Sequence, residues 1–174
     1  MNAPLARMFV FCLMIALLAA PAHAERKIKK SKIVGNDGKQ IGTLELTEGT
    51  KGVIIGIKVA GLPPGHHGMH FHKKGDCTDL QKFKSAGGHV DPFKKPHGFL
   101  NEKGPHEGNL PNLVVLDNGS AEVELYTSLV QLSGDKANLL DEDGSALIIH
   151  TNRDDHTSQP IGGSGSRIAC SVIK

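Results

Sequence analysis

Apolar and polar residues alternate along most of the chain, and this period of two predicts β-strands rather than helices. The alternation is clearest at residues 52–59, where four apolar side chains would share one face: Val53, Ile55, Ile57 and Val59. Seven further stretches have the same alternation or a short apolar run of strand length: residues 27–34, 41–46, 69–72, 113–116, 121–126, 146–150 and 167–173. The sequence therefore predicts about eight short strands.

Turn signals between these stretches indicate antiparallel neighbours. Asp37-Gly38 and Asn118-Gly119 are dipeptides typical of tight β-hairpin turns. Residues 129–143 fit no single pattern and leave room for one helical turn. Together these features predict an all-β fold, an eight-stranded antiparallel Greek-key barrel or sandwich.

Two long loops interrupt the strand pattern, one from Gly75 to about Leu110 and one at residues 152–166. Loops of this length in a compact domain are usually functional or disordered. The first loop has few apolar residues but three histidines, so we expect a bound metal ion to order it.

The first 24 residues have the features of a cleaved signal peptide. Arg7 supplies the positive charge, an apolar run follows at residues 8–20, and Ala22-His23-Ala24 is a small-x-small cleavage pattern. The apolar run is shorter than the roughly 20 residues of a membrane span, although an uncleaved anchor is the alternative. We therefore expect a single domain at residues 25–174 that leaves the membrane after cleavage.

The charge of that domain is nearly balanced. Removal of residues 1–24 takes away Arg7 and no acid, which leaves 19 bases and 18 acids. A net charge of +1 gives no reason to expect nucleic acid as a partner. The basic segment 26–32 alternates, so a solvated edge strand is a better interpretation than a polyanion site.

Two cysteines lie outside the predicted signal peptide, Cys77 and Cys170. An even number of cysteines in an exported protein suggests a disulfide bond. Two buried free thiols are the alternative.

The spacing of the histidines indicates a metal site. His70 and His72 lie two residues apart, so on a strand both rings would be on one face. This His-x-His pattern is weak evidence by itself, but His150 ends another predicted strand and His89 lies in the first long loop. Four imidazoles without cysteine or methionine suit a copper ion that changes oxidation state.

The first long loop offers a second group of histidines, namely His89, His97 and His106. Their spacings of eight and nine residues do not fit one helix face, but a loop could fold them around one ion. Zinc is the expected metal for such a set. A solvated, histidine-rich loop is the alternative.

Four motifs make the pattern specific. They read GHHGMHFH at residues 65–72, AGGHVDP at 86–92, PHEGNLP at 105–111 and GGSGSRIACSVI at 162–173. From about residue 27 to 174, the chain resembles the copper/zinc superoxide dismutase family, in particular its bacterial exported branch.

The resemblance implies a role for each motif residue. The copper ligands would be His70, His72, His89 and His150. The zinc ligands would be His89, which bridges the two metals, with His97 and His106. Asp154 would link a copper histidine to a zinc histidine, and Cys77 and Cys170 would form the disulfide.

Other positions are assigned from the same resemblance. Arg167 would hold the superoxide anion, His89 would also take part in proton transfer, and Lys74 would steer anions to the copper. Lys73 is as well explained as a solvated residue. We expect His67 to make structural hydrogen bonds, and we interpret His66 and His156 as surface residues without a role.

One position departs from the family pattern. The fourth zinc ligand of the family is an aspartate three residues after the last zinc histidine, and this chain has Asn109 there. A neutral amide oxygen is a poorer zinc ligand than a carboxylate. Our hypothesis is a weakened zinc site, and the alternative is that Asn109 still binds the ion.

The expected function is therefore copper-dependent dismutation of superoxide to oxygen and hydrogen peroxide, with copper and zinc as cofactors. A copper-only dismutase and a copper-binding module without activity are the alternatives. The resemblance also implies a periplasmic or secreted protein that is a monomer or a homodimer.

Overall fold

The computed structural model describes residues 27–135 and 137–174. The predicted signal peptide and its cleavage point lie outside these residues. Within them, no helix is both long and apolar enough to cross a lipid bilayer.

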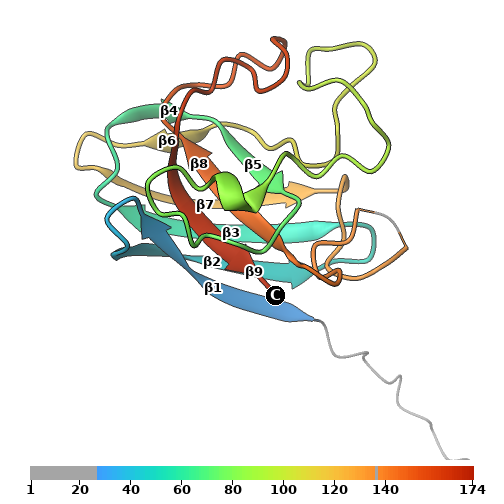
Figure 1. Ribbon diagram of the computed structural model, residues 1–174, viewed down its shortest axis with the longest axis horizontal. Coiled ribbons are helices and arrows are strands. Elements are labelled where there is room, and N and C mark those ends of the chain that lie inside the picture. Colours follow the sequence, from blue (N-terminus) through green and yellow to red (C-terminus); the bar gives the residue numbers. More distant parts are fainter. Residues whose placement is uncertain (1–26, 136) are drawn as a thin grey trace, which may run out of the picture.

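Antiparallel strands form nearly all of the regular structure (Figure 1). One sheet has the order β5-β8-β9-β1-β2-β3-β7, and a small second sheet pairs β4 with β6. The bounds are β1 (Ile28–Gly35), β2 (Gln40–Glu48), β3 (Val53–Ala60), β4 (Gly65–His67), β5 (Met69–His72), β6 (Leu113–Val115), β7 (Ser120–Thr127), β8 (Ser145–His150) and β9 (Arg167–Ile173).

The alternation in the sequence sets which side chains form the core. In β3 the apolar residues Val53, Ile55 and Ile57 have no exposed surface, because β2 and β7 pair with β3 on either side. Met69 and Phe71 of β5 enter the same core. His70 and His72 alternate with these two residues, so their side chains point to the opposite face of β5. The long loops cover that face.

The all-β fold that the sequence predicts is confirmed, with two differences in detail. The described chain has nine strands, because the GHHGMHFH motif forms two strands that meet at Gly68. A side chain at Gly68 would lie 2.4 Å from the Ser164 hydroxyl, so the backbone of one long loop packs directly against this position.

The sequence analysis left room for one helical turn at residues 129–143. The described part of that segment has none, and Gln131 and Asn138 form an isolated bridge there. A 3₁₀ turn, η1 (Lys84–Ala86), lies instead in the first long loop. The carboxylate of Asp79 stabilises its start by accepting the backbone N–H groups of Lys84 and Ser85 at 2.8 and 3.0 Å.

Packing orders part of the first long loop without any metal. Phe83 and Ala86 of the loop are fully buried in a second apolar cluster with Ala146, Ile148 and Cys170. The sequence analysis expected a metal ion to order this loop and did not foresee this contribution from Phe83 and Ala86.

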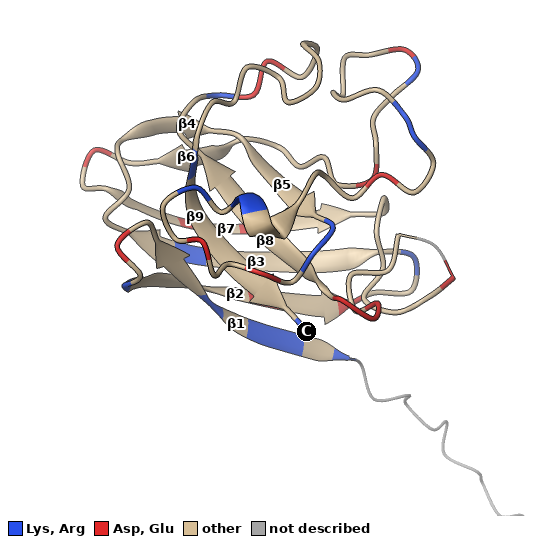
Figure 2. Cartoon of the chain, viewed as in Figure 1, with Lys and Arg blue, Asp and Glu red and all other residues tan. Residues whose placement is uncertain are grey.

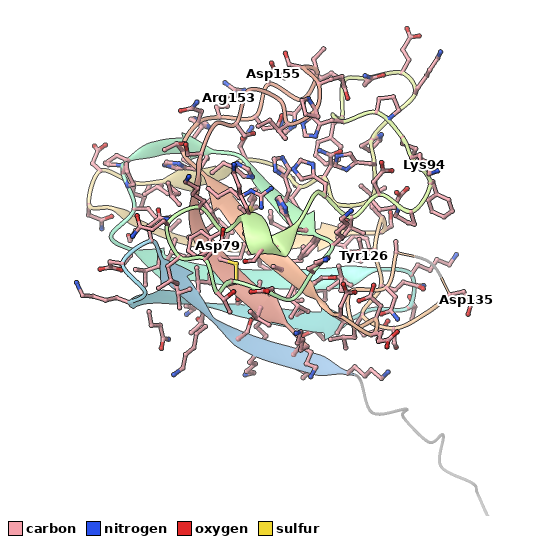
Figure 3. All side chains as sticks on the ribbon, in the orientation of Figure 1. Asp79, Lys94, Tyr126, Asp135, Arg153 and Asp155 are labelled. Atoms are coloured by element: carbon pink, nitrogen blue, oxygen red, sulfur yellow. A yellow bond between two sulfur atoms is a disulfide. The ribbon has the colours of Figure 1, made fainter. Side chains whose placement is uncertain are left out.

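The disulfide between Cys77 and Cys170 is confirmed, with a Cα–Cα distance of 5.9 Å. It appears as a yellow bond near the labelled Asp79 in Figure 3. The bond joins residues 93 positions apart and ties the first long loop to β9.

Charged residues are spread over the molecule, as Figure 2 shows. Several lysines lie within β1. Lys30 and Lys32 are exposed, and Lys30 forms an ion pair with Glu45 at 2.9 Å. The basic segment is therefore an exposed strand, as its alternation predicts. Its described residues pair only with β2, because β9 pairs with β1 only at Val34 and Gly35.

Candidate metal centre

Two paired strands and one loop bring four histidines together. His70 and His72 share one face of β5, and His150 lies at the end of β8, the strand that pairs with β5. The loop residue His89 forms an isolated bridge with His72. Figure 3 shows nitrogen-bearing rings gathered between the sheet and the loop that carries Arg153 and Asp155.

Hydrogen bonds fix the orientation of three of these rings. His70 Nε2 donates to Asp154 Oδ2 at 2.7 Å, His72 Nδ1 donates to the Gly87 carbonyl at 2.9 Å, and His150 Nδ1 donates to the Gly165 carbonyl at 3.2 Å. Since one nitrogen of each ring carries a proton for its acceptor, the other nitrogen is left with a lone pair.

The free nitrogens converge on one point. Ligand atoms of the four histidines all lie within 4.8 Å of one another. Among the described residues, the buried ring nitrogens without a hydrogen-bond partner include one from each: His70 Nδ1, His72 Nε2, His89 Nε2 and His150 Nε2. Buried polar atoms normally have partners, so this arrangement fits a metal ion that all four would bind.

Burial keeps these rings neutral, as metal ligands must be. Burial, together with neighbouring charged groups, holds the pKa values of His72 and His89 well below the ordinary value for histidine. Burial also lowers the pKa of His150, to about 3, and repulsion by a protonated His70 adds to this effect.

A second cluster shares His89 with the first. His106 Nε2 lies 2.9 Å from His89 Nδ1 and 3.3 Å from His97 Nδ1. Ligand atoms of these three residues also lie within 4.8 Å of one another. Because the two nitrogens of His89 face different clusters, one imidazole would connect two ions.

Asp154 accepts a hydrogen bond from one histidine of each cluster. Its carboxylate accepts from His70 Nε2 at 2.7 Å and from His97 Nε2 at 3.0 Å, with no exposed surface. Burial raises the pKa of Asp154, but the hydrogen bonds from His70, His97 and the His156 backbone outweigh it and hold that pKa well below its ordinary value. The carboxylate is therefore charged and fixes both rings.

Asn109 lies at the second cluster but does not offer it an acceptor. Its Oδ1 accepts the Gly98 backbone N–H at 3.2 Å, and its Nδ2 lies 3.1 Å from His97 Nδ1. The side chain is fully buried. Three imidazoles therefore suit a zinc ion, and the fourth position of the family pattern presents a donor.

Arg167 lies beside the first cluster. Its Nη1 donates to the Phe83 carbonyl at 2.5 Å and its Nη2 to the Gly87 carbonyl at 2.8 Å. Gly87 also accepts from His72, so one carbonyl positions both the guanidinium and a cluster histidine. Burial lowers the pKa of Arg167, but the group stays cationic at neutral pH.

The remaining predicted residues have separate places. Lys73 and Lys74 are exposed, directly after β5. His67 is confirmed as a structural residue, since its ring nitrogens each lie 2.8 Å from a carbonyl oxygen, of Pro63 and of His150. His66 is exposed, as expected.

The prediction for His156 was wrong. Its backbone N–H donates to Asp154 Oδ1 at 2.7 Å, and its ring packs against Phe99 in a tilted arrangement, with centroids 5.2 Å apart. The sequence analysis did not select Asn112, which makes two hydrogen bonds to the Asp154 backbone. Its Oδ1 accepts the Asp154 N–H at 2.8 Å, and its Nδ2 donates to the Asp154 carbonyl at 2.9 Å.

Gln159 is a second residue that sequence reasoning missed. It makes two hydrogen bonds to the His97 backbone: its Oε1 accepts the N–H and its Nε2 donates to the carbonyl, each at 2.9 Å. No spacing rule reveals these contacts, because they join loops that are far apart in the sequence.

Solvent reaches the second cluster through a cavity of about 360 Å³. Its lining includes all three histidines of that cluster and the charged residues Asp91, Lys95 and Arg167. A small anion could therefore approach the metal-binding nitrogens from this side.

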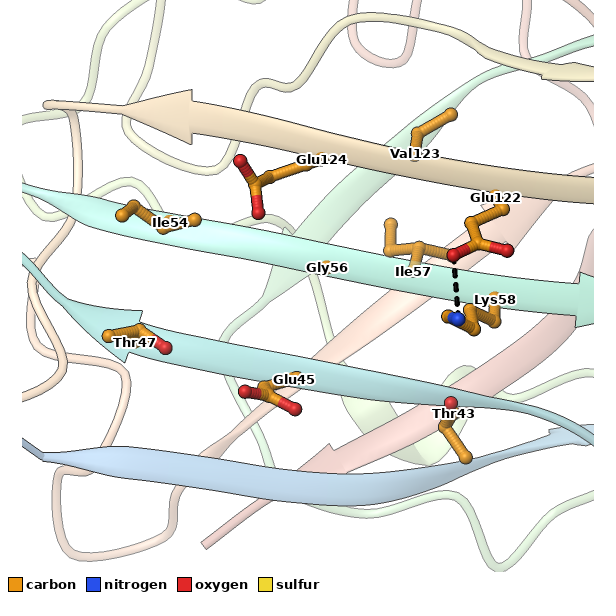
Figure 4. A pocket seen from close by; sticks show the side chains of 10 residues that line it. All are labelled: Thr43, Glu45, Thr47, Ile54, Gly56, Ile57, Lys58, Glu122, Val123 and Glu124. Atoms are coloured by element: carbon orange, nitrogen blue, oxygen red, sulfur yellow. Dashed lines mark ion pairs between the residues drawn. The ribbon is translucent and has the colours of Figure 1, made fainter.

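Another hollow, of about 330 Å³, lies on the outer face of β2, β3 and β7 (Figure 4). It forms over Gly56, which has no side chain, and Lys58 beside it pairs with Glu122 at 2.6 Å. No histidine lines it. We interpret it as part of a solvated sheet face.

Comparisons with known proteins agree with the geometry. A family model described as copper/zinc superoxide dismutase matches residues 40–173. A Cu-Zn superoxide dismutase of Caulobacter vibrioides is 46% identical over 145 residues, which cover 82% of this chain and 83% of the relative.

Solved structures give the same result. The crystal structure of a SOD-like protein from Bacillus subtilis matches with a TM-score of 0.80 and 40% identity, over 83% of this chain and 97% of that one. The Cu/Zn superoxide dismutase of Brucella abortus matches with a TM-score of 0.70 and 27% identity, over 85% of this chain and 100% of that one.

Proposed function

The chain belongs to the copper/zinc superoxide dismutase family, and we propose how its residues divide the work of the reaction. Two superoxide anions and two protons become oxygen and hydrogen peroxide, with copper and zinc as cofactors. The observation that carries the residue assignment is the convergence of four unpartnered, buried imidazole nitrogens on one point.

We assign copper to the first cluster, which consists of His70, His72, His89 and His150. Copper, when bound, supplies the one-electron couple that oxidises one superoxide and reduces the next. The set contains only neutral nitrogen donors, which suits copper in both oxidation states. Asp154 and the carbonyls of Gly87 and Gly165 orient three of the rings.

Arg167 binds the substrate anion. Two of its N–H groups are held by carbonyls, so the guanidinium is fixed beside the His72 ring and keeps its charge. A fixed cation binds superoxide with little loss of side-chain entropy. We assign Lys74, exposed after β5, to the attraction of anions from solvent, because positive charge near a site raises the rate at which anions reach it.

His89 holds and moves a proton. Its Nε2 faces the first cluster and its Nδ1 faces the second, so a change at one nitrogen is felt at the other. The reduced substrate needs protons, and a His89 Nε2–H in the first cluster is a source within that cluster. A zinc ion, which we assign to the second cluster, would be held by His89 together with His97 and His106.

Asn109 supports a second candidate, a dismutase that works with copper and holds zinc weakly. The amide directs a donor at the second cluster and removes one negative charge from it. A copper-binding module without activity is less well supported, because such a module needs no fixed anion-binding group like Arg167.

We also propose that residues 1–24 are a cleaved signal peptide and that residues 25–174 are exported to the periplasm or beyond. The disulfide between Cys77 and Cys170 supports this, since such bonds persist mainly in oxidising compartments. Whether the exported protein is a monomer or a homodimer stays a prediction for mass measurement in solution.

One experiment tests the function. Metal content and dismutation rate are measured on the same disulfide-intact sample before and after copper loading. We expect about one copper per chain and a fast rate that depends on copper. Full copper occupancy with a negligible rate would contradict the enzyme and favour the copper-binding module.

A further inference from the structure

The amide of Asn109 has a fixed orientation. Its Oδ1 accepts the Gly98 backbone N–H at 3.2 Å in a place without solvent exposure. Turning the amide over would set its NH₂ group against that N–H, donor against donor, and both would lose their partner. The oxygen therefore stays on Gly98, and the nitrogen stays towards the second cluster.

An aspartate could serve both neighbours, because it has two acceptor oxygens. One would accept from Gly98, and the other would be free for the metal. Asn109 has a single oxygen, which Gly98 already uses. Its Nδ2 lies 3.1 Å from His97 Nδ1, the ring nitrogen that faces His106, and donates there. A metal bound at His97 Nδ1 would replace this hydrogen bond and leave the Nδ2 hydrogen for another acceptor. The side chain therefore cannot complete a metal site without breaking a buried hydrogen bond.

A donor at this position favours a ligand that is an acceptor. Three histidines and the loss of one carboxylate leave a divalent ion with less compensating charge than in the family pattern. Zinc sites with three protein ligands characteristically take their fourth ligand from solvent. The cavity of about 360 Å³ reaches the three histidines, and its charged lining residues are Asp91, Arg167 and Lys95, which pairs with the buried Glu107 at 2.8 Å.

We propose that the second cluster holds its metal through His89, His97 and His106 alone and takes a small exogenous anion as the fourth ligand, with Asn109 Nδ2 as the hydrogen-bond donor to that anion. This rests on the proposed function, because it requires a metal ion in the second cluster. It goes beyond the proposed function by assigning an anion to the fourth position of the second cluster.

Cobalt(II) provides a direct test, because its d–d absorption reports its own coordination and is independent of dismutase activity. The full exported chain is prepared with copper as colourless Cu(I) and one equivalent of Co(II), and sodium azide is titrated in. We expect a saturable change in the position and intensity of the Co(II) bands. In Asn109→Asp the bands should not respond, because a carboxylate oxygen fills the position.

The same two proteins are compared for zinc affinity by chelator competition. Asn109→Asp should bind zinc tighter by roughly tenfold or more, within the range over which residues around a metal change its affinity. Asn118→Asp is the matched control. It makes the same charge change at the turn before β7, where Oδ1 accepts the Ser120 N–H at 3.0 Å, and it should behave as the native chain does.

Three results would overturn the proposal: no Co(II) binding by the native chain, Co(II) bands that azide leaves unchanged, or equal azide responses in the native chain and Asn109→Asp. None of these depends on the dismutation rate. If one of these results were found together with a copper-dependent dismutation rate, the proposed function would stand. If azide changed the Co(II) bands but no copper-dependent rate were found, only the proposed function would be contradicted.

Discussion

At the scale of single residues, most of the chemistry depends on which nitrogen of each ring is used. His70 presents Nδ1 to the first cluster because Asp154 holds its Nε2, and His72 presents Nε2 because Gly87 holds its Nδ1. One carboxylate that accepts from His70 and His97 therefore sets which ring nitrogen each of them presents to its cluster.

This predicts the effect of Asp154→Asn. The amide keeps one acceptor but turns an N–H donor towards either His70 or His97, so one ring loses its orientation. We expect both metals to bind about 10–100-fold more weakly, together with a changed Cu(II) EPR spectrum. Chelator competition for each metal and EPR of the copper-loaded protein would measure these effects.

Asp155→Asn is the control for that variant. Asp155 is the exposed neighbour, and its Oδ1 accepts backbone N–H groups of Thr157 and Ser158 at 2.8 Å each. It makes the same charge change without touching a histidine. Equal metal affinities in the two variants would show that Asp154 does not orient the rings.

At the scale of elements, close contacts between loop backbones position the site. The first long loop lies along β5, where Phe71 donates its N–H to the Gly108 carbonyl at 2.9 Å and accepts from Val90 N–H at 2.8 Å. These contacts carry His89 and Asn109 to the histidines of β5. The second long loop then covers them through Asp154 and Gln159.

Gly98 is the clearest test of this loop contact. It has a φ of +104°, and a side chain there would lie 2.0 Å from the His156 carbonyl oxygen. Gly98→Ala should therefore separate the two loops and lower the free energy of unfolding by about 1–3 kcal/mol. Urea unfolding and the rate of metal release to a chelator would both report it.

Gly56→Ala is the comparison. The nearest atoms to a side chain at Gly56, in the hollow of Figure 4, are those of Glu45 at 3.8 Å, so a methyl group fits. We expect little change in stability or metal release. If Gly98→Ala behaved like Gly56→Ala, the loop contact would not hold the site together.

At the scale of the whole molecule, the disulfide joins stability to the metal centre. It fastens residues 93 positions apart, and the loop it fastens carries the Gly87 carbonyl that positions His72 and Arg167. In Cys77→Ala/Cys170→Ala we expect a loss of up to about 4–5 kcal/mol in the free energy of unfolding.

We also expect weaker copper binding in that double variant, since its Gly87 carbonyl is less firmly held. Denaturant unfolding and copper competition, compared with chemically reduced native protein, would test both effects. Unchanged copper affinity in a folded double variant would count against the connection.

The metal-free protein should lose stability as the pH falls from about 6.5 towards 4. Burial and neighbouring histidines lower the pKa of His106 to about 4, and burial and His70 lower that of His150 to about 3. Over this range the unfolded chain binds protons that the folded chain does not, so acid favours unfolding. Each pKa unit corresponds to about 1.4 kcal/mol.

Urea unfolding of the chelator-treated protein at pH 7.5, 5.5 and 4.5 would measure this loss. Carboxylates with a lowered pKa, such as Asp154, add to it only near and below their unfolded value of 3.8. Constant stability between pH 7.5 and 4.5 would mean that the rings can be protonated in the folded state.

The sequence by itself determined the strands and the residue types of the metal centre. Alternation requires only that one face of a strand is buried, so the apolar residues of β3 and the shared face of His70 and His72 could be predicted. The disulfide could also be predicted, because Cys77 and Cys170 are the two cysteines outside the predicted signal peptide.

Only the tertiary structure decided how the centre is held. Asn112, His156 and Gln159 act through backbone groups of distant loops, and the Asn109 amide has its orientation from the Gly98 N–H. Local periodicity carries no information about such contacts. They arise where loops meet and each buried donor must find an acceptor, and that pairing exists only once the chain has folded.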